Sequence, residues 1–384
     1  MVDLNKPMID HLIKFQVPKQ ASWLYTIGFS LIFIFIFQIA SGVSMAIHYK
    51  PSTRLAFLSI HRNDRIFKYG WLVRSLHVCG SSALFLLLYL HMFKGIYYKS
   101  YYGSKKTLWL TGSIIHLFII LIGFFGSILN WSQMSYWTTV VITNFIGSIP
   151  IFGKPLRLIL LGGYTVGGST LRRSFVFHCI LPFICLIFIM IHLLLVYIKG
   201  QTSPIANRLP VSNSFEDVYP NFVVKDIVVC IIIMFIIYVL CLIYPNIILN
   251  KLSYIPADYY KTPTDIELKW YFMPYYTIIK TFESKTLSIA SIIALLSSLM
   301  FIPHIYNIKL SNIMTDGYRL HVITAFISLI LLGLIGKYRY SKLISKLSKV
   351  CVLWYLGFIS LPLVIKIILF INKNYKKYWT KTTK

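Results

Sequence analysis

The chain of 384 residues is 57% hydrophobic and 13% charged, and its mean hydropathy is +0.71. These values exclude an ordinary soluble domain and indicate an integral membrane protein. The net charge of +27 does not indicate nucleic-acid binding, because the lysines and arginines lie mostly between apolar runs and form no basic stripe. We expect lipid headgroups and acidic partner subunits as neighbours instead.

Eight apolar runs are long enough to cross about 30 Å of hydrocarbon as helices. They cover residues 22–48, 70–98, 108–130, 171–197, 222–245, 286–304, 318–336 and 347–371. The predicted fold is therefore all-α, a polytopic membrane protein with eight transmembrane helices. Its predicted parts are an N-terminal interfacial segment (1–21), a four-helix bundle with interfacial helices before its last span (22–200), a C-terminal membrane domain (201–371) and a polar tail (372–384).

Orientation and targeting are weakly encoded. Lysines and arginines are almost evenly divided between the two sets of alternate loops, so the positive-inside rule gives no orientation. The N-terminus resembles neither a secretory signal nor a transit peptide, and such a hydrophobic chain is typical of an organelle genome. The six cysteines form no CxxC or CxxCH motif, so they indicate core packing, with no sign of a zinc site or covalent haem attachment.

Two predicted helices carry histidine pairs with one spacing. His77 and His91 are fourteen residues apart, and so are His178 and His192. Fourteen helical residues return a side chain to within about 40° of its first direction and move it about 21 Å along the axis. The predicted helices 70–98 and 171–197 are separated in the chain by one antiparallel helix, 108–130, so both run in the same direction. The first histidines of the two pairs therefore lie level near one membrane face, and the second histidines near the other.

Two facing imidazoles suit a haem iron, because they fill both axial positions and leave none open for oxygen chemistry. We therefore predict two non-covalent b-type haems that carry electrons, with His77 and His178 on one iron and His91 and His192 on the other. A lone histidine on an apolar helix is more often a hydrogen-bonded core residue. The repeated spacing is what favours ligation.

Glycines and basic residues fit the same arrangement. The fourteen-residue spacing recurs in two glycine pairs, Gly28 with Gly42 and Gly112 with Gly126. A flat macrocycle needs such close backbone approach, although each pair alone also fits ordinary helix packing. Arg74 and Lys94 each lie one turn outside a histidine, placed to meet a haem propionate, although a snorkelling cation explains either alone. Gly80 is a further predicted point of close packing.

Five segments carry a family resemblance: QIASGVSMAIHY (38–49), YGWLVRSLHVCG (69–80), WSQMSYWTTVVITN (131–144), GGYTVGGSTLRRSFVFHCILPF (162–183) and YPNFVVKDI (219–227). Together they resemble cytochrome b of the quinol:cytochrome c oxidoreductase, mitochondrial complex III. The later helices match mainly by hydropathy and order. Equal histidine spacings and a single eight-helix chain favour the respiratory type over its photosynthetic relative.

The resemblance implies that ubiquinol is oxidised near a low-potential haem at His77 and His178. One electron would pass to a Rieske iron-sulfur protein and the other through a high-potential haem at His91 and His192 to quinone, in a proton-translocating Q cycle. It also implies a cytochrome c-type subunit, other complex III subunits, a homodimeric complex, a lipid bilayer that includes cardiolipin, and the mitochondrial inner membrane with both termini in the matrix. Arg173 joins the implied cofactor-binding residues.

At the quinol-oxidising site the implied residues are Thr138, Lys269, Trp270, Tyr271 and Tyr276. Lys269 stands where the family has a glutamate that accepts a proton, and Glu267 replaces a common lysine. A lysine could take that role only if burial lowered its pKa by about 3 units or more. We hypothesise that Lys269 does not, and that the proton leaves through water, Tyr276 or the Rieske partner's histidine. The alternative is an exposed lysine in a rearranged loop.

Other positions also depart from the family. Thr138 replaces a glycine and Asn130 a proline near the quinol pocket. At the quinone-reducing site Lys225 and Asp226 match the family, where the aspartate would donate a proton; a carboxylate favoured by the helix dipole is the alternative reading. Tyr197 stands in place of a histidine and can donate a hydrogen bond. Phe29 replaces a polar residue.

Two other function classes fit part of the pattern. A transporter with histidines in a proton path explains buried histidines, but not the glycine pairs or the paired basic residues. A non-bifurcating di-haem anchor of a membrane dehydrogenase explains the haem sites, but such anchors usually have fewer helices. We expect the remaining histidines His48, His116, His304 and His321 to be structural or interfacial.

Overall fold

The structure is a computed structural model, and it describes residues 15–19, 21–202, 215–244, 249–306, 312–339, 341–358 and 360. Its helices are α2 (Ile27–Ala46), α3 (Ala56–Ile66), α4 (Gly70–Tyr97), α5 (Lys106–Ile128), α6 (Gln133–Gly147), α7 (Gly153–Leu161), α8 (Gly168–Lys199), α9 (Asn221–Ile243), α10 (Met273–Thr281), α11 (Lys285–Ile305) and α12 (Asn312–Ile335). Short 3-10 turns are η1 (Trp23–Tyr25), η2 (Gly103–Lys105) and η4 (Lys251–Tyr254), and the strands are β1 (Gln16–Pro18) and β2 (Phe215–Asp217).

The all-α membrane fold predicted from the sequence is confirmed. In the described part of the chain, seven helices are long and apolar enough to cross a membrane, and they coincide with the first seven predicted spans. A further helix covers residues 342–358. The rest of the eighth predicted span, the polar tail and most of the N-terminal segment lie outside the described residues.

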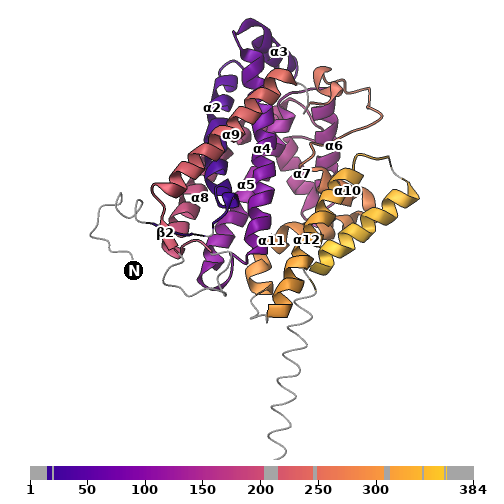
Figure 1. The fold of residues 1–384 in the computed structure, drawn as a ribbon. Helices are drawn as coiled ribbons and strands as arrows, with labels where there is room; N and C mark the ends of the chain where they lie inside the picture. Colours follow the sequence, from indigo (N-terminus) through magenta and orange to yellow (C-terminus); the bar gives the residue numbers. More distant parts are fainter. Residues whose placement is uncertain are drawn as a thin grey trace, which may run out of the picture. The chain divides into compact units, whose positions relative to one another are not determined.

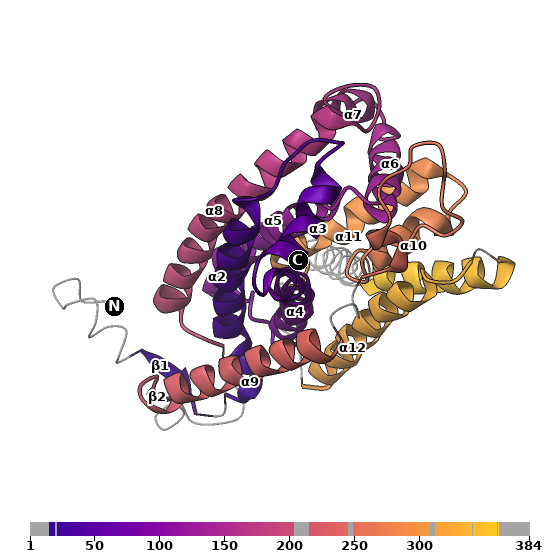
Figure 2. The same ribbon diagram turned by 90° about the horizontal axis from the view of Figure 1, so that it is seen from above.

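The chain forms two compact units, residues 1–100 with 107–271, and residues 101–106 with 272–384. In the first unit α2 packs on α4, α8 and α9, and α3 packs on α4 (Figures 1 and 2). The division at residue 201 that the sequence suggests stays a prediction. In the first unit α9 also packs against α4.

The connections of the first unit are ordered by hydrogen bonds. β1 pairs antiparallel with β2 and so ties the segment before α2 to the segment before α9. The predicted short helices between the third and fourth spans are α6 and α7. Ser132 caps α6 by accepting a hydrogen bond from the backbone N–H of Ser135. The loop that begins at η4 packs on α6, because Gln133 N–H donates to Ile255 O at 2.9 Å.

The second unit is held by α10 packed on α11 and α12. The Thr277 hydroxyl donates to Leu332 O at 2.7 Å, and the hydroxyls of Tyr101 and Tyr318 lie 2.9 Å apart. All six cysteines are free and five of them are buried, as expected for core residues.

Candidate haem and quinone sites

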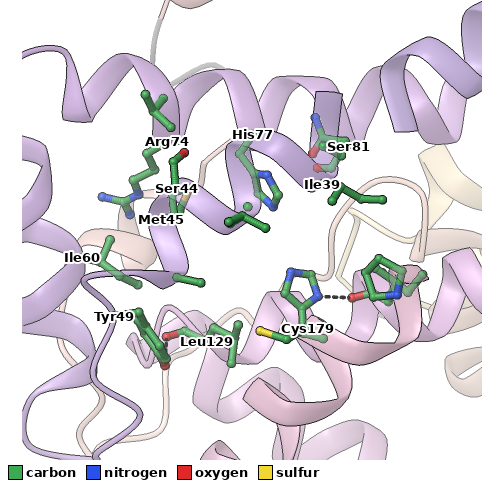
Figure 3. A pocket seen from close by; sticks show the side chains of 18 of the residues that line it. Ile39, Ser44, Met45, Tyr49, Ile60, Arg74, His77, Ser81, Leu129 and Cys179 are labelled. Atoms are coloured by element: carbon green, nitrogen blue, oxygen red, sulfur yellow. Dashed lines mark hydrogen bonds between the residues drawn. The ribbon is translucent and has the colours of Figure 1, made fainter. Parts of the chain in front are cut away.

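A cavity of about 390 Å³ lies in the first unit between α4 and α8. It is lined by His77 of α4 and His178 of α8, whose ring centroids are 6.2 Å apart with the planes at 85°. Figure 3 shows Arg74 and His77 reaching into this cavity from the same helix, with Tyr49 and Cys179 on the opposite wall. The first histidines of the two predicted pairs therefore face each other.

The separation of these rings fits one iron ion. Metal–nitrogen bonds of about 2 Å to two imidazoles on opposite sides of a metal put the ring centroids about 6 Å apart. The Nδ1 atoms are engaged elsewhere: Ser41 Oγ lies 3.0 Å from Nδ1 of His77, and His178 Nδ1 donates to Ile122 O at 2.9 Å. Both Nε2 atoms are thereby left for a metal, and each ring is oriented by a hydrogen bond.

A second cavity of about 320 Å³ is lined by His91 of α4 and His192 of α8. Thr111 Oγ1 lies 2.9 Å from His192 Nδ1. His91 Nδ1 is buried and has no hydrogen-bond partner among the described residues. Both cavity volumes are within the range of about 300 to 1,000 Å³ that small-molecule sites occupy. Among the described residues no group of three or more His, Cys, Asp or Glu is placed to hold a metal ion.

Each glycine of the two predicted pairs faces one histidine. A Cβ atom added at Gly28, Gly42, Gly112 or Gly126 would lie nearest to Cε1 of His91, His77, His192 or His178, at 3.5, 3.2, 3.2 and 2.5 Å respectively. The sequence predicts close approach of a macrocycle, whereas the structure has close approach of the imidazole. The reason is position, because each glycine of α2 or α5 stands level with a histidine of the neighbouring helix.

The two basic residues line the cavities that the sequence assigns them. Arg74 lines the first cavity but donates to Asp64 Oδ2 at 2.5 Å and to Asn130 Oδ1 at 3.2 Å. Lys94 lines the second cavity, 3.5 Å from Leu24 O and 4.1 Å from the Tyr25 ring centroid. Contact of either residue with a propionate stays a prediction.

Arg173 and Gly80 lie outside the linings of both cavities. The Arg173 guanidinium donates to Ile159 O, so it holds the end of α7 and has no contact that supports a cofactor role. Gly80 is a point of close packing as predicted, since a Cβ there would collide with the side-chain amide of Gln38.

The motif at residues 269–271 packs against the part of α4 that follows His77 in the sequence. Trp270 Nε1 donates to Ser82 Oγ at 2.6 Å, and the Tyr271 ring stacks on Phe85 at 3.9 Å. Lys269 is partly buried, which disfavours the exposed-loop alternative. Burial, together with the nearby Arg74 guanidinium, lowers the pKa of Lys269 from 10.5 to about 8. Because this pKa is still above 7, the lysine is mostly charged at neutral pH.

The other quinol-site candidates are distributed over both units. Glu267 is exposed, and its carboxylate accepts a hydrogen bond from the side-chain amide of Asn250 at 3.1 Å. Thr138 of α6 is buried, and its hydroxyl has no partner among the described residues. Tyr276 belongs to the second unit, where burial raises its pKa and Lys280 Nζ lies 4.3 Å from its ring centroid.

The quinone-reducing candidates gather at the second cavity. Asp226, Tyr197 and Phe29 all line it. Asp226 Oδ1 is buried and has no partner among the described residues, which is the state expected of a group that meets a ligand. Lys225 does not line the cavity, and its Nζ lies 6.0 Å from the ring centroid of Phe222.

Comparison with known proteins identifies the family. Residues 12–200 match the family model described as cytochrome b/b6/petB, and residues 256–356 match cytochrome b(C-terminal)/b6/petD. A cytochrome b of Cyanidium caldarium is 33% identical over 86% of this chain and 87% of its own length. The chain belongs to the cytochrome b family.

Further relatives agree. A cytochrome b of Rickettsia typhi is 34% identical over 83% of this chain and 80% of its own length. The cytochrome b/c1 of Bradyrhizobium diazoefficiens is 34% identical over 77% of the chain, which spans 43% of that longer protein. A solved hyperthermophilic respiratory complex III has a chain with a TM-score of 0.86 and 28% identity, covering 93% of this chain and 95% of its own.

Membership of the cytochrome b family defines the activity. The chain is a haem-binding, membrane-spanning subunit of a quinol:cytochrome c oxidoreductase in a respiratory membrane, and it works within a multi-subunit complex. The transporter alternative is set aside by this relationship, and so is the dehydrogenase anchor.

Sequence reasoning missed the residues that orient the histidines. Ser41 and Thr111 hold His77 and His192, and each immediately precedes a glycine of the predicted pairs. The other two glycines follow apolar residues. The sequence did contain a signal for them, namely a serine or threonine directly before a glycine that faces a histidine. This signal would have indicated that His77 and His192 each have a hydroxyl partner.

Thr138 leads to a prediction for this cytochrome b. We expect methoxyacrylate-type inhibitors to bind weakly, because the family resemblance implies that the branched side chain of Thr138 stands in place of a glycine at the oxidation pocket. Thr138→Gly should tighten inhibition by roughly ten- to a hundredfold, the equivalent of relieving 1 to 3 kcal/mol of overpacking. Inhibitor titration of turnover checks this, and nanomolar inhibition of the unaltered protein would contradict it.

Proposed function

We propose that this cytochrome b holds two b-type haems and performs a proton-translocating Q cycle with ubiquinol and ubiquinone. One observation carries the proposal: the two histidine-lined cavities share Phe35, Leu84 and Ile119 in their linings. Redox groups held on either side of this common apolar wall are near enough for electrons to cross inside one chain. When bound, haem supplies reversible one-electron transfer.

Each protein group then has a defined task. His77 with His178 and His91 with His192 would hold the two haems, while Ser41 and Thr111 orient two of the rings. Each of the four glycines leaves room for the imidazole that faces it. The low-potential haem belongs to the first cavity and the high-potential haem to the second, as the family resemblance implies.

Ubiquinol oxidation belongs on the side of the first cavity, where the Trp270–Tyr271 motif packs on α4. One electron leaves to a Rieske iron-sulfur partner and then to a cytochrome c-type subunit, and the other crosses within this chain. On the opposite side Asp226 donates a proton to quinone and Tyr197 donates a hydrogen bond. The unpartnered Asp226 Oδ1 in the second cavity supports this assignment.

The proposed setting is a homodimeric complex in the mitochondrial inner membrane, with both termini in the matrix and cardiolipin among its lipids. Purified complex should reduce cytochrome c with ubiquinol, and separate inhibitors of the two quinone sites should block turnover at different steps. Cytochrome c reduction that is insensitive to inhibitors of the quinone-reducing site would contradict a bifurcated cycle.

Lys269 gives a prediction of its own. We expect Lys269→Glu to leave turnover level or lower, because a carboxylate there would be bound by Arg74 and would be a poor proton acceptor. Turnover measured at equal haem content checks this, and a large rise would contradict it.

The pH dependence tests the same point independently. Because burial lowers the pKa of Lys269 to about 8, its neutral fraction grows as the pH rises from 7 to 9. A lysine acting as the proton acceptor would therefore make turnover rise through this window. We expect Lys269→Met and the unaltered protein to have the same profile. A rise near pH 8 that Lys269→Met loses would overturn our hypothesis.

A further inference from the structure

One carboxylate stands at the first cavity. Of the residues that line it in the described part of the chain, Asp64 of α3 is the sole Asp or Glu. Its Oδ2 atom lies 2.5 Å from Nη1 of Arg74, a residue that is 7% exposed. A charged pair at this distance in a largely buried setting holds both side chains in place.

Arg74 is held from a second direction as well. Its Nη2 donates to Asn130 Oδ1, and Asn130 Nδ2 in turn donates to Ser253 O at 2.7 Å. The guanidinium also lies 5.7 Å from the ring centroid of Tyr254.

Other charges surround the pair. Lys68 also lines the first cavity, and Arg74 is close enough to Lys269 to oppose its protonation. His61 Nδ1 lies 3.8 Å from Asp64 Oδ2. Lys68 is exposed, whereas Arg74 is buried, and a buried cation left without a counter-charge is strongly destabilising. The exposed carboxylate of Glu267 contacts Asn250 instead, so Asp64 is the acid placed to offset the charge of Arg74.

We propose that Asp64 is the positioning carboxylate of the quinol-oxidising side: it holds Arg74 beside the His77–His178 site and supplies the negative charge that the motif lacks at Lys269. The inference rests on the proposed function, since it needs a haem between His77 and His178. This carboxylate lies on α3 and contacts Arg74 directly.

The charge has a direct consequence for redox equilibrium. A bis-imidazole haem carries one more positive charge when oxidised than when reduced. A fixed negative charge nearby stabilises the oxidised form by Coulomb attraction and lowers the midpoint potential, and the effect is largest where water is excluded. Asp64 therefore keeps the haem of the first cavity low in potential, and it has no such effect at the second cavity.

Redox titration of the b haems in the purified complex tests this. Asp64→Asn is expected to raise the midpoint potential of the first haem and leave the second unchanged. Asp258→Asn, the same substitution at an aspartate outside both cavities, should change neither. The double variant Asp64→Asn with Lys269→Glu puts a carboxylate back where the family has one, and its first potential should return toward that of the unaltered complex.

The outcomes separate this inference from the proposed function. Two haems in the unaltered complex and an unmoved potential in Asp64→Asn would overturn the role of Asp64 alone, as would an equal shift of both haems. Fewer than two haems in the unaltered complex would overturn the proposed function instead. If Asp64→Asn does not assemble, the double variant decides: assembly with a near-normal potential supports the role, and failure or a raised potential refutes it.

Discussion

His178→Leu is expected to remove one of two b haems and to reduce quinol:cytochrome c reductase activity by at least about 100-fold. Loss of a residue that only hydrogen-bonds to a metal ligand already costs up to about 100-fold, and loss of the ligand itself should cost no less. Leucine fills much of the same volume but has no nitrogen to bind iron. The haem content and the b-region spectrum of the purified complex measure the loss.

His116→Leu is the matched control for this experiment. His116 is also a buried histidine of the first unit, at 1% exposure, and neither of its ring nitrogens has a partner among the described residues. It lines neither cavity. Its replacement should leave both haems in place, whereas full haem content in His178→Leu would remove the basis of the first site.

The second large effect concerns the glycines. Gly126→Ala is expected to displace His178 and release the haem of the first cavity, because the new Cβ would lie 2.5 Å from His178 Cε1 where carbon atoms normally keep about 3.5 to 4.0 Å. The imidazole cannot retreat without breaking its hydrogen bond to Ile122. The strain is of the order of 1 to 3 kcal/mol, as for overpacked cores.

Gly28→Ala is the comparison, since its Cβ would lie 3.5 Å from His91 Cε1, an ordinary contact. We expect Gly28→Ala to retain most of the second haem and Gly126→Ala to lose most of the first. Equal losses in the two variants would show that the glycines serve general helix packing, and would contradict a specific contact with each ligand.

The sequence predicted the helical fold well, because long apolar runs and a spacing repeated in four helices are local signals. The same spacing indicated which histidines face each other, as His77 and His178 do at 6.2 Å. It could not predict that Asp64 binds Arg74, since α3 and α4 meet through a turn whose geometry no periodicity encodes.

The sequence predicted least about the motif at residues 267–271. The sequence shows that Lys269 and Glu267 depart from the family, but burial and hydrogen bonding decide their properties. Lys269 lies near Arg74, while Glu267 turns outward to Asn250. The apparent exchange of charges in the sequence is therefore not an exchange in space, and the carboxylate that contacts Arg74 belongs to Asp64, which is far from Lys269 in the sequence.

Potentiometric titration of the purified complex, followed in the b region of the reduced-minus-oxidised spectrum, tests the central claim most directly. Two histidine-lined cavities on α4 and α8 predict two haem components of different potential, each titrating as a one-electron couple. The lower component should vanish in His178→Leu and the higher one in His192→Leu. A single component, or both components surviving either substitution, would contradict the assignment of the two sites.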